Sequence, residues 1–454
     1  MIRSLLLASA ACALALPLAL PAAAQTVAIV NARIEPVSSA TIPNGTLVIK
    51  DGKIAALGAN ITVPAGAKVI DAKGGVVTPG FVAPSSNLGA SEVSGVRETR
   101  DDGTGNALSA AFDISYGINP ASTFLGLARD GGITSSAVTP VLTGTGGGAH
   151  EHADDGVVEE MTAGKTGDGD PPLFGGQAAF IQLKAGAPDI VEASKLAVTV
   201  SLGESGARAA GGSRGADLVL IRSALEDARA FAARRAAFEQ GATRDFGLSR
   251  LDLQALIPVV QGKIPLLIRV SRAADIRQAL KLAAEERIKV VLEGVEEGWT
   301  VAPEIAKAGV PVIVDPQADL PDSFEALGSR LDNAARLHAA GVTVAINGSR
   351  DFNNLRQERL NAGLAVANGL PYAAALAGVT LVPAKIWGQD GKVGSLEVGK
   401  LADVVVWNGD PLETTSWPTT VLVGGVEQPK NGRHEQLKAR YAAGDQGGYP
   451  PAYR

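Results

Sequence analysis

Cysteine is nearly missing from this chain of 454 residues, since Cys12 is the only one. It lies in the first 24 residues, which we expect to be removed, so the mature protein would contain no thiol. A disulfide, a thiolate metal ligand and a cysteine nucleophile are therefore excluded for the mature chain. Its stability must come from a packed core, which a chain of this length with 46% hydrophobic residues can build.

Histidine is almost as scarce, with four in the whole chain: His150, His152, His338 and His434. His150 and His152 stand two residues apart with carboxylates beside them, so they form a candidate metal-binding pair. Glycines flank this segment, and the sequence contains no feature that would fix the positions of the two imidazoles. A solvated polar loop is therefore the simpler interpretation. We expect His338 and His434 to be ordinary surface or packing residues.

A basic patch is missing too. The chain has 41 Lys and Arg against 47 Asp and Glu, with no long run of one sign. Phosphate recognition needs clustered positive charge, so we expect no nucleic-acid partner. After residue 25 no apolar run is long enough to span a bilayer, and we expect no membrane span in the mature chain.

Residues 1–24 differ from the rest of the chain. Arg3 supplies positive charge, residues 5–20 are almost continuously apolar, and residues 22–24 have small side chains. This pattern is typical of a Sec-type signal peptide cleaved near Ala24, and it predicts a periplasmic or secreted protein. A membrane anchor is the alternative, but the apolar run is short and two prolines interrupt it.

Both ends of the mature chain have β-character. Short apolar or alternating runs stand at residues 27–30, 46–49 and 53–57, and again at 403–407 and 421–425. Asp51-Gly52 predicts a hairpin between two of these runs, and Pro43-Asn44-Gly45 predicts a turn. Residues 429–454 form a polar tail that we expect to be weakly structured.

Residues 79–390 follow another pattern. From about residue 215, strands predicted at 264–268, 290–292, 310–314 and 343–346 alternate with helices predicted at 275–287, 301–308 and 332–340. Their number and length suit a (β/α)₈ barrel, although a doubly wound open sheet fits the same pattern. Residues 90–175 are the least regular, and we predict a long loop region there at the barrel mouth.

Several motifs resemble the amidohydrolase superfamily. Val77-Thr78-Pro79-Gly80-Phe81 resembles the entry into its first barrel strand, and residues 394–406 resemble its closing β segment, followed by Asn408-Gly409-Asp410-Pro411-Leu412. Gly175-Gly176-Gln177 is similar to the imidazolonepropionase and dipeptidase branch. The resemblance covers essentially the whole mature chain. It implies a TIM-like barrel at 79–390 beside a small β-sandwich formed by 26–78 and 391–428, with the chemistry at the C-terminal strand ends.

The resemblance also implies where metal ligands should stand, because amidohydrolases activate water on one or two divalent cations, commonly zinc. None of those positions carries a competent ligand set; they are occupied by Ser85, Asn87, Arg269, Ser271, Glu293, Gly294 and Ser349. Arg269 even adds a permanent positive charge. A local register shift could bring in Asp351, and Lys184 could be offered as a bridging lysine, but it would have no metal to bridge. We therefore expect no metal cofactor.

Three hypotheses for function remain open. The first is a pseudo-hydrolase that binds a small molecule or peptide-like ligand, or assembles with itself or with an active relative. The second is a hydrolase of amide, cyclic amide or dipeptide C–N bonds with a rebuilt site, and the third is a structural periplasmic protein. Under the first hypothesis, Arg269 could grip a carboxylate through two parallel hydrogen bonds. Alternatively, Arg269 pairs with Glu293 at the end of the next strand.

Export can be tested directly. We expect mass spectrometry of the exported protein to find a mature N-terminus close to Gln25, because small residues precede it as signal peptidase requires. Met1 retained on a membrane-embedded species would contradict this prediction.

Overall fold

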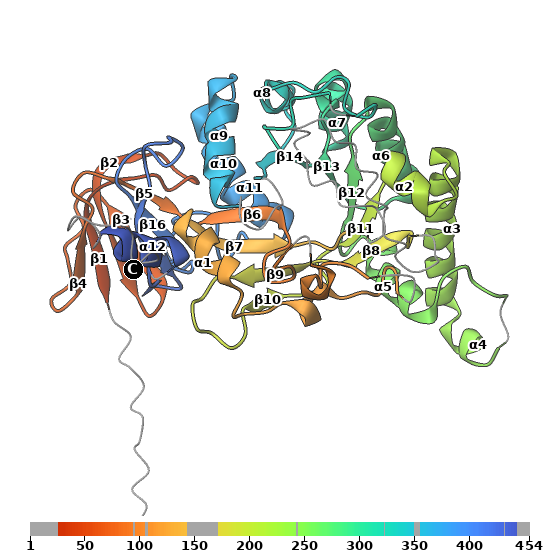
Figure 1. Ribbon diagram of the computed structural model, residues 1–454, viewed down its shortest axis with the longest axis horizontal. Helices are drawn as coiled ribbons and strands as arrows, with labels where there is room; N and C mark the ends of the chain where they lie inside the picture. The colour runs from red at the N-terminus through yellow and green to blue at the C-terminus, as the bar shows by residue number, and fades with distance from the viewer. Residues whose placement is uncertain are drawn as a thin grey trace, which may run out of the picture.

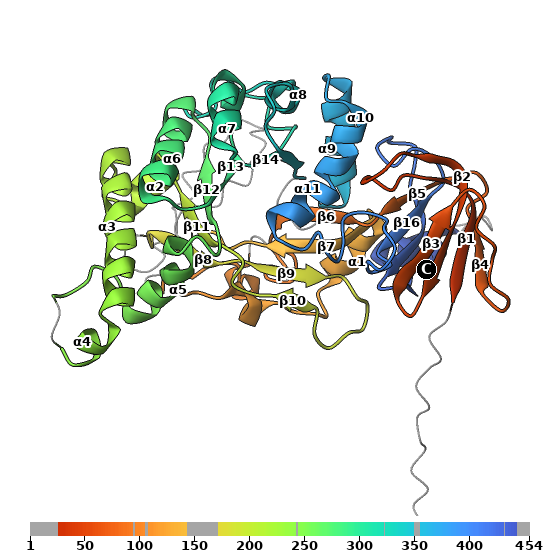
Figure 2. The same ribbon diagram turned by 180° about the vertical axis from the view of Figure 1, so that it is seen from behind.

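The computed structural model describes residues 26–93, 96–104, 108–142, 171–241, 244–321, 323–348, 355–430 and 432–442. Two units lie side by side in both views, a smaller β unit and a larger α/β unit (Figure 1; Figure 2). The predicted signal peptide and the end of the predicted tail lie outside the described residues.

The β unit is built from both terminal segments. Its eight-stranded sheet has the order β18-β17-β16-β5-β1-β2-β3, with β4 also paired to β1. The strands are β1 (Val27–Ile34), β2 (Ile42–Lys50), β3 (Lys53–Gly58), β4 (Lys68–Asp71), β5 (Val76–Pro79), β16 (Val404–Trp407), β17 (Pro418–Val423) and β18 (Val426–Glu427). The segments join where β5 pairs antiparallel with β16.

This single sheet curls over its own core. Ile54 exchanges backbone hydrogen bonds with Lys400 and Gly399, just before β16, so β3 lies beside the other end of the sheet. The enclosed side chains include Ile29, Leu47, Ile49, Val77, Val404 and Leu422. The sandwich-like shape therefore comes from one curled sheet and not from two separately bonded sheets.

One turn prediction in this unit is confirmed and one is wrong. Asp51 and Gly52 have φ angles of 54° and 74° and join β2 to β3, as an Asp-Gly hairpin requires. Residues 43–45 were predicted as a turn but lie inside β2, where Gly45 pairs with Ala32 across an irregular register. Pro43 is compatible with this strand because the pairing is already interrupted there.

The larger unit holds the barrel strands β6 (Phe81–Ser86), β7 (Ile133–Val138), β8 (Phe174–Gln177), β9 (Ala179–Gln182), β11 (Val198–Ser201), β12 (Leu266–Val270), β13 (Val290–Gly294), β14 (Val312–Val314) and β15 (Val344–Ile346), with β10 (Val191–Ala193) at one edge. They form two ladders, β10-β9-β7-β6 and β15-β14-β13-β12-β11-β8, and β15 lies beside β6. All neighbours from β11 to β15 are parallel, whereas β8 and β9 run antiparallel to β11 and β7.

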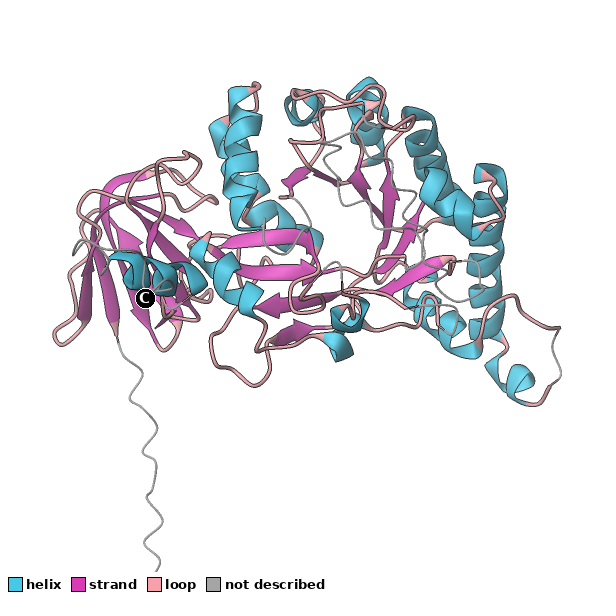
Figure 3. Cartoon of the chain, viewed as in Figure 1, coloured by secondary structure: helices cyan, strands magenta, loops and turns pink. Residues whose placement is uncertain are grey.

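Helices lie around the outer side of these strands, and the short helix α4 projects beyond α3 (Figure 1; Figure 3). They are α1 (Thr123–Asp130), α2 (Gly203–Ala209), α3 (Arg214–Ala233), α4 (Arg235–Glu239), α5 (Arg250–Val260), α6 (Ala273–Glu286), α7 (Ala302–Ala308), α8 (Asn333–Ala339), α9 (Glu358–Ala367), α10 (Tyr372–Gly378) and α11 (Leu381–Ile386). Short 3₁₀ turns stand at Arg97–Thr99, Ile114–Gly117, Gly298–Thr300 and Leu355–Gln357. None of these described helices has the length and apolar character to cross a membrane.

The four strands and three helices predicted between residues 264 and 346 are confirmed as β12 to β15 and α6 to α8. The long loop predicted for residues 90–175 is partly wrong, because α1 and β7 lie in it. β7 reads Ile-Thr-Ser-Ser-Ala-Val, and its hydroxyl residues hid a strand that is buried along its whole length. The prediction of a weakly structured tail is wrong in part, because α12 (Arg433–Ala442) lies in it.

Strand alternation separates the inside of the barrel from its outside. Leu267, Val291, Ile313 and Ala345 share one core cluster inside the barrel, while their strand neighbours pack outward in a second cluster with the helices. The positions two residues further along the same strands face inward again, at the C-terminal mouth. This alternation decides which side chains can form a site.

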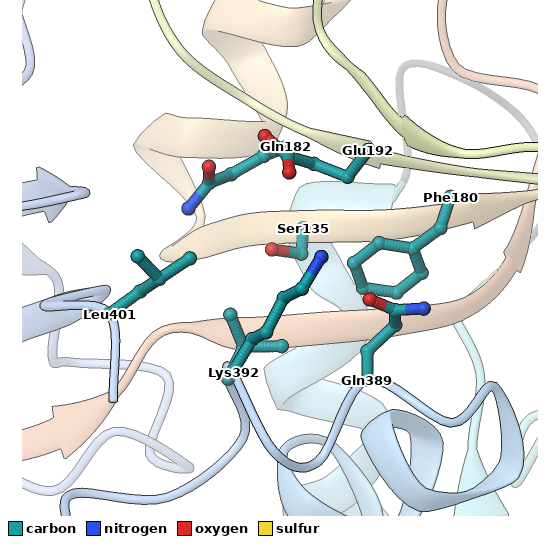
Figure 4. Close-up of a pocket in the computed structure, with 8 residues that line it drawn as sticks. Ser135, Phe180, Gln182, Glu192, Gln389, Lys392 and Leu401 are labelled. Carbon is teal, nitrogen blue, oxygen red and sulfur yellow. The ribbon is translucent and has the colours of Figure 1, made fainter. Parts of the chain in front are cut away.

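Asp403 connects the β unit to the barrel. Its Oδ1 accepts a hydrogen bond from the Gly424 amide at 2.7 Å, and the Gln182 side-chain amide donates to both carboxylate oxygens at 2.8 Å. Ser135 also donates to Oδ2. Figure 4 shows Ser135 and Gln182 lining a small pocket with Lys392. Burial raises the pKa of Asp403 to about 6, against the opposing effect of its hydrogen bonds.

This pKa predicts a pH-dependent stability. The folded pKa of Asp403, about 6, lies above the ordinary aspartate value of 3.8, so the folded state holds the proton more tightly than the unfolded state. The stabilisation is present below about pH 4 and is lost as pH rises through 6. We expect urea denaturation to show this loss, on the order of 3 kcal/mol, in the wild type and not in Asp403→Asn. Parallel pH profiles for the two proteins would contradict the assignment.

Candidate functional site

The mouth of the barrel carries a layer of polar side chains. Arg269 of β12 and Glu293 of β13 lie two positions beyond the apolar interior layer, and Asp315 and Asn347 directly follow β14 and β15 in the same way. The parallel register places these strand ends side by side. In a barrel of this kind the C-terminal strand ends are where a site is formed.

Arg269 is held by the protein itself. Its Nε donates to Glu293 Oε2 at 2.9 Å, one terminal nitrogen donates to the Pro140 carbonyl at 2.8 Å, and the other donates to Thr139 Oγ1 at 3.1 Å. Arg269 and Glu293 are also direct partners across the β12–β13 ladder. The side chain of Glu293 is only 8% exposed and that of Arg269 is 20% exposed. The ion pair that sequence analysis left as the alternative is therefore present in the structure.

Ser85 extends this arrangement to the first barrel strand. Its hydroxyl lies 2.7 Å from Thr139 Oγ1, and both residues are fully buried. Ser85, Thr139, Arg269 and Glu293 thus form one connected chain of side chains, which we call the mouth network. It joins β6, the end of β7, β12 and β13. A carboxylate ligand could use the guanidinium in bidentate fashion only by displacing some of these partners.

Gly294 occupies a backbone conformation that few other residues can adopt. Its φ is +96°, and a Cβ there would lie 3.1 Å from Glu296 Oε2 and 3.2 Å from the Val270 carbonyl. A histidine at this position would therefore be strained, whatever else surrounded it. Ser271 follows β12 and its carbonyl accepts the Glu297 amide, so it supports the loop above the strand.

The remaining predicted site residues are placed only in part. Asn87 follows β6 with its Oδ1 buried and without a partner among the described residues. Ser349, Asp351, His150 and His152 lie outside the described residues. Within the described ranges, no three side chains from His, Cys, Asp and Glu gather as metal ligands.

The other ligand candidates are not at the mouth. His338 is exposed in the last turn of α8, and His434 lies in α12. Lys184 follows β9, near Asp403, and pairs with Glu192 at 2.8 Å. Because β9 runs antiparallel to β7, Lys184 follows β9 at the end of β7 that lies away from the mouth.

A second group of buried polar residues, which was not predicted from the sequence, lies beside the mouth network. Asp315, Asn347, Glu358 and Asn361 form what we call the oxygen cluster. Asn361 Nδ2 donates to Asp315 Oδ1 at 2.8 Å and to the Asn347 carbonyl at 3.1 Å. Glu358 is fully buried at the start of α9, and burial raises its pKa well above the ordinary value. The available signal was a polar pair spaced three residues apart on the buried face of a helix, with Ala362 and Ala365.

Comparison with known families agrees with this fold. Residues 216–428 match the amidohydrolase family. This part of the chain is an amidohydrolase domain. It contains β12 to β15, α9 and the strands that close the β unit. The predicted resemblance to amidohydrolases is confirmed.

Curated relatives of the amidohydrolase domain match it over different lengths. The amidohydrolase tasK of Hapsidospora irregularis is 23% identical over 397 residues, which cover 81% of this chain and 38% of that protein. The imidazolonepropionase of Aromatoleum aromaticum is 42% identical over 97 residues, or 20% of this chain and 23% of that enzyme. A 5-methylthioadenosine/S-adenosylhomocysteine deaminase of Desulforudis audaxviator is 35% identical over 113 residues, or 23% of this chain and 25% of that protein. The matches thus span well under half of each relative.

Solved structures show the same fold over most of the chain. An amidohydrolase from Thermotoga maritima superposes with a TM-score of 0.75 at 24% identity, covering 88% of this chain and 99% of that one. Molinate hydrolase superposes with a TM-score of 0.53 at 19% identity, covering 90% and 96%. The predicted TIM-like barrel with a small β unit is therefore the fold of this protein.

Removal of the Arg269 guanidinium tests the mouth network. We expect Arg269→Ala to lower the free energy of unfolding by about 3–5 kcal/mol, because it breaks the buried 2.9 Å ion pair with Glu293. The double variant Arg269→Met/Glu293→Gln should recover most of this loss. Arg277→Ala is the matched control, since its 3.0 Å pair with Glu304 is exposed and should contribute less than about 1 kcal/mol. Equal effects of both single variants in chemical denaturation would contradict the prediction.

Proposed function

We propose that this protein is an exported pseudo-hydrolase of the amidohydrolase family, free of a catalytic metal, that binds a small molecule or an active relative without turnover. The observation that carries the proposal is the mouth network. Its members Ser85, Arg269 and Glu293 stand at positions where the family holds metal ligands, and they bond to one another or to Thr139. Side chains that satisfy each other in this way have less capacity to hold an ion.

Charge supports the same proposal. A guanidinium cannot be deprotonated in a protein, so Arg269 places a fixed positive charge beside the position of the expected cation. Glu293 neutralises that charge locally at 2.9 Å. A metal ion entering here would need to compete with Arg269 for Glu293 and would meet Arg269 itself at close range. Both effects oppose binding of a divalent cation at these strand ends.

The lengths of the relatives support a protein partner. The match to the Hapsidospora irregularis protein covers 38% of it, so most of that chain lies outside the part similar to this protein. A domain of this kind thus stands there within a longer polypeptide. For this protein we propose an active amidohydrolase as the partner.

The second candidate is a hydrolase of C–N bonds with a rebuilt site. The names of the relatives favour it, since they include a deaminase and an imidazolonepropionase. Such an enzyme would need a water-activating group other than Ser85, Arg269 or Glu293, because the hydrogen bonds above already engage these three.

Metal analysis combined with activity assays separates the two candidates. We expect elemental analysis of the dialysed protein to find zinc, manganese and iron well below one atom per chain. Hydrolysis of dipeptides, N-acyl amino acids and cyclic amides should not exceed the buffer rate, with or without added zinc. About one tightly held metal per chain, lost on Asp351→Ala, would overturn the pseudo-hydrolase proposal. So would metal-independent turnover that is abolished by Ser85→Ala.

A further inference from the structure

Four oxygen atoms without hydrogen-bond partners belong to the oxygen cluster. They are Asn347 Oδ1, both carboxyl oxygens of Glu358 and Asn361 Oδ1, each buried and without a donor among the described residues. The three residues are exposed by 4%, 0% and 1%. Buried oxygens of this kind normally have a donor, and leaving one unpaired costs roughly 1–3 kcal/mol. All four belong to residues at the end of β15 and in the first turn of α9, where a bound group could supply the missing partners.

The backbone and side-chain contacts hold these residues together. Asn361 touches both Asp315 and the Asn347 carbonyl through its Nδ2. Glu358 lies three residues before Asn361 and therefore on the same face of α9. Gly348 allows the approach of that helix, because a Cβ at this glycine would lie 3.2 Å from the Glu358 Cα. The end of β15 and the first turn of α9 are thus packed directly against each other.

A proton alone does not satisfy this cluster. A protonated Glu358 would supply one O–H donor, which can pair with one of the neighbouring amide oxygens. The remaining oxygens would still have no donor, since Asn361 Nδ2 is already used by Asp315 and Asn347. A cation differs because it can accept several oxygens at once.

We propose that the oxygen cluster binds one calcium ion. Its groups are two carboxylates and two amides, so all the donors are hard oxygens and none is an imidazole or a thiolate. The charges of Asp315 and Glu358 match a divalent cation. Magnesium retains several of its waters, and the burial of Asn347, Glu358 and Asn361 leaves little room for them. The site differs from the expected family ligand positions, and it does not depend on whether the protein is a hydrolase.

Calcium binding can be measured on the whole protein after chelator dialysis. We expect isothermal titration with calcium chloride to give one site per chain. At a calcium concentration roughly a hundred times the dissociation constant, the melting temperature should rise by about 3 °C. Glu358→Gln replaces the carboxyl group by an amide with little change of shape and should abolish both effects. Sodium and magnesium at matched ionic strength should give a smaller shift.

Two further variants keep the test decisive. Asp217→Asn is the matched control, because Asp217 is another buried carboxylate without a partner among the described residues, on α3, and its loss should leave the calcium effect unchanged. Asn347→Asp adds a third carboxylate and should enlarge the calcium-dependent shift. The proposal is wrong if calcium produces neither heat nor a shift in the wild type. It is also wrong if Glu358→Gln retains the effect, or if that variant is more stable than the wild type and calcium stabilises neither protein.

Discussion

A buried ion pair between neighbouring strands determines the character of the barrel mouth. Arg269 and Glu293 face inward at the same level of the β12–β13 ladder, so their charges compensate each other where water is largely excluded. Neither side chain could remain there alone at low cost. Thr139, Pro140 and Ser85 complete the hydrogen bonding around the guanidinium, directly or through one another. The mouth is consequently occupied by hydrogen bonds and an ion pair between residues of the chain itself.

The two polar groups at the mouth differ in how well they are satisfied. The mouth network combines donors and acceptors, and the three nitrogens of Arg269 each have a partner. The oxygen cluster combines mainly acceptors, and Glu358 has none of the donors that its carboxyl would need. The same barrel end therefore contains one region whose charges are paired within the protein and one whose buried oxygens have no donor among the described residues. Arg269 supplies positive charge to the first region.

Asp403 performs a comparable joining role at the other end of the barrel. Its carboxylate accepts bonds from the β unit through Gly424 and from the barrel through Gln182 and Ser135. The residue belongs to the closing motif of the β unit, and its position beside β16 makes both contacts possible. This explains why the two units are packed as one body although strands from both chain ends form the smaller one.

Sequence patterns were sufficient to predict strands and helices where the spacing of apolar residues is regular. The strands and helices from β12 to α8 follow directly from apolar runs alternating with helical spacing, and Asp51-Gly52 requires the left-handed backbone of a tight hairpin. The sequence also placed particular residues at the expected ligand positions, namely Ser85, Asn87, Arg269 and Glu293. This was possible because the motifs at residues 77–81 and 394–406 mark where the barrel begins and ends. β7 was not predicted, because serine and threonine are typical of loops and stand in the middle of this strand. The antiparallel direction of β8 and β9 was not predicted either, because the spacing of apolar residues does not depend on strand direction.

What the sequence by itself determined was the order of elements, the fold class and the residue types at the strand ends. Only the tertiary structure decided which of these residues meet. Arg269 could bind a ligand or pair with Glu293, and strand register settled the pairing. Asp315, Asn347, Glu358 and Asn361 come from two strand ends and a helix, and the bonds from Asn361 to Asp315 and to the Asn347 carbonyl form only when α9 packs against those strand ends. Contacts between residues distant in sequence depend on the packing of whole elements, and local sequence carries no measure of that packing.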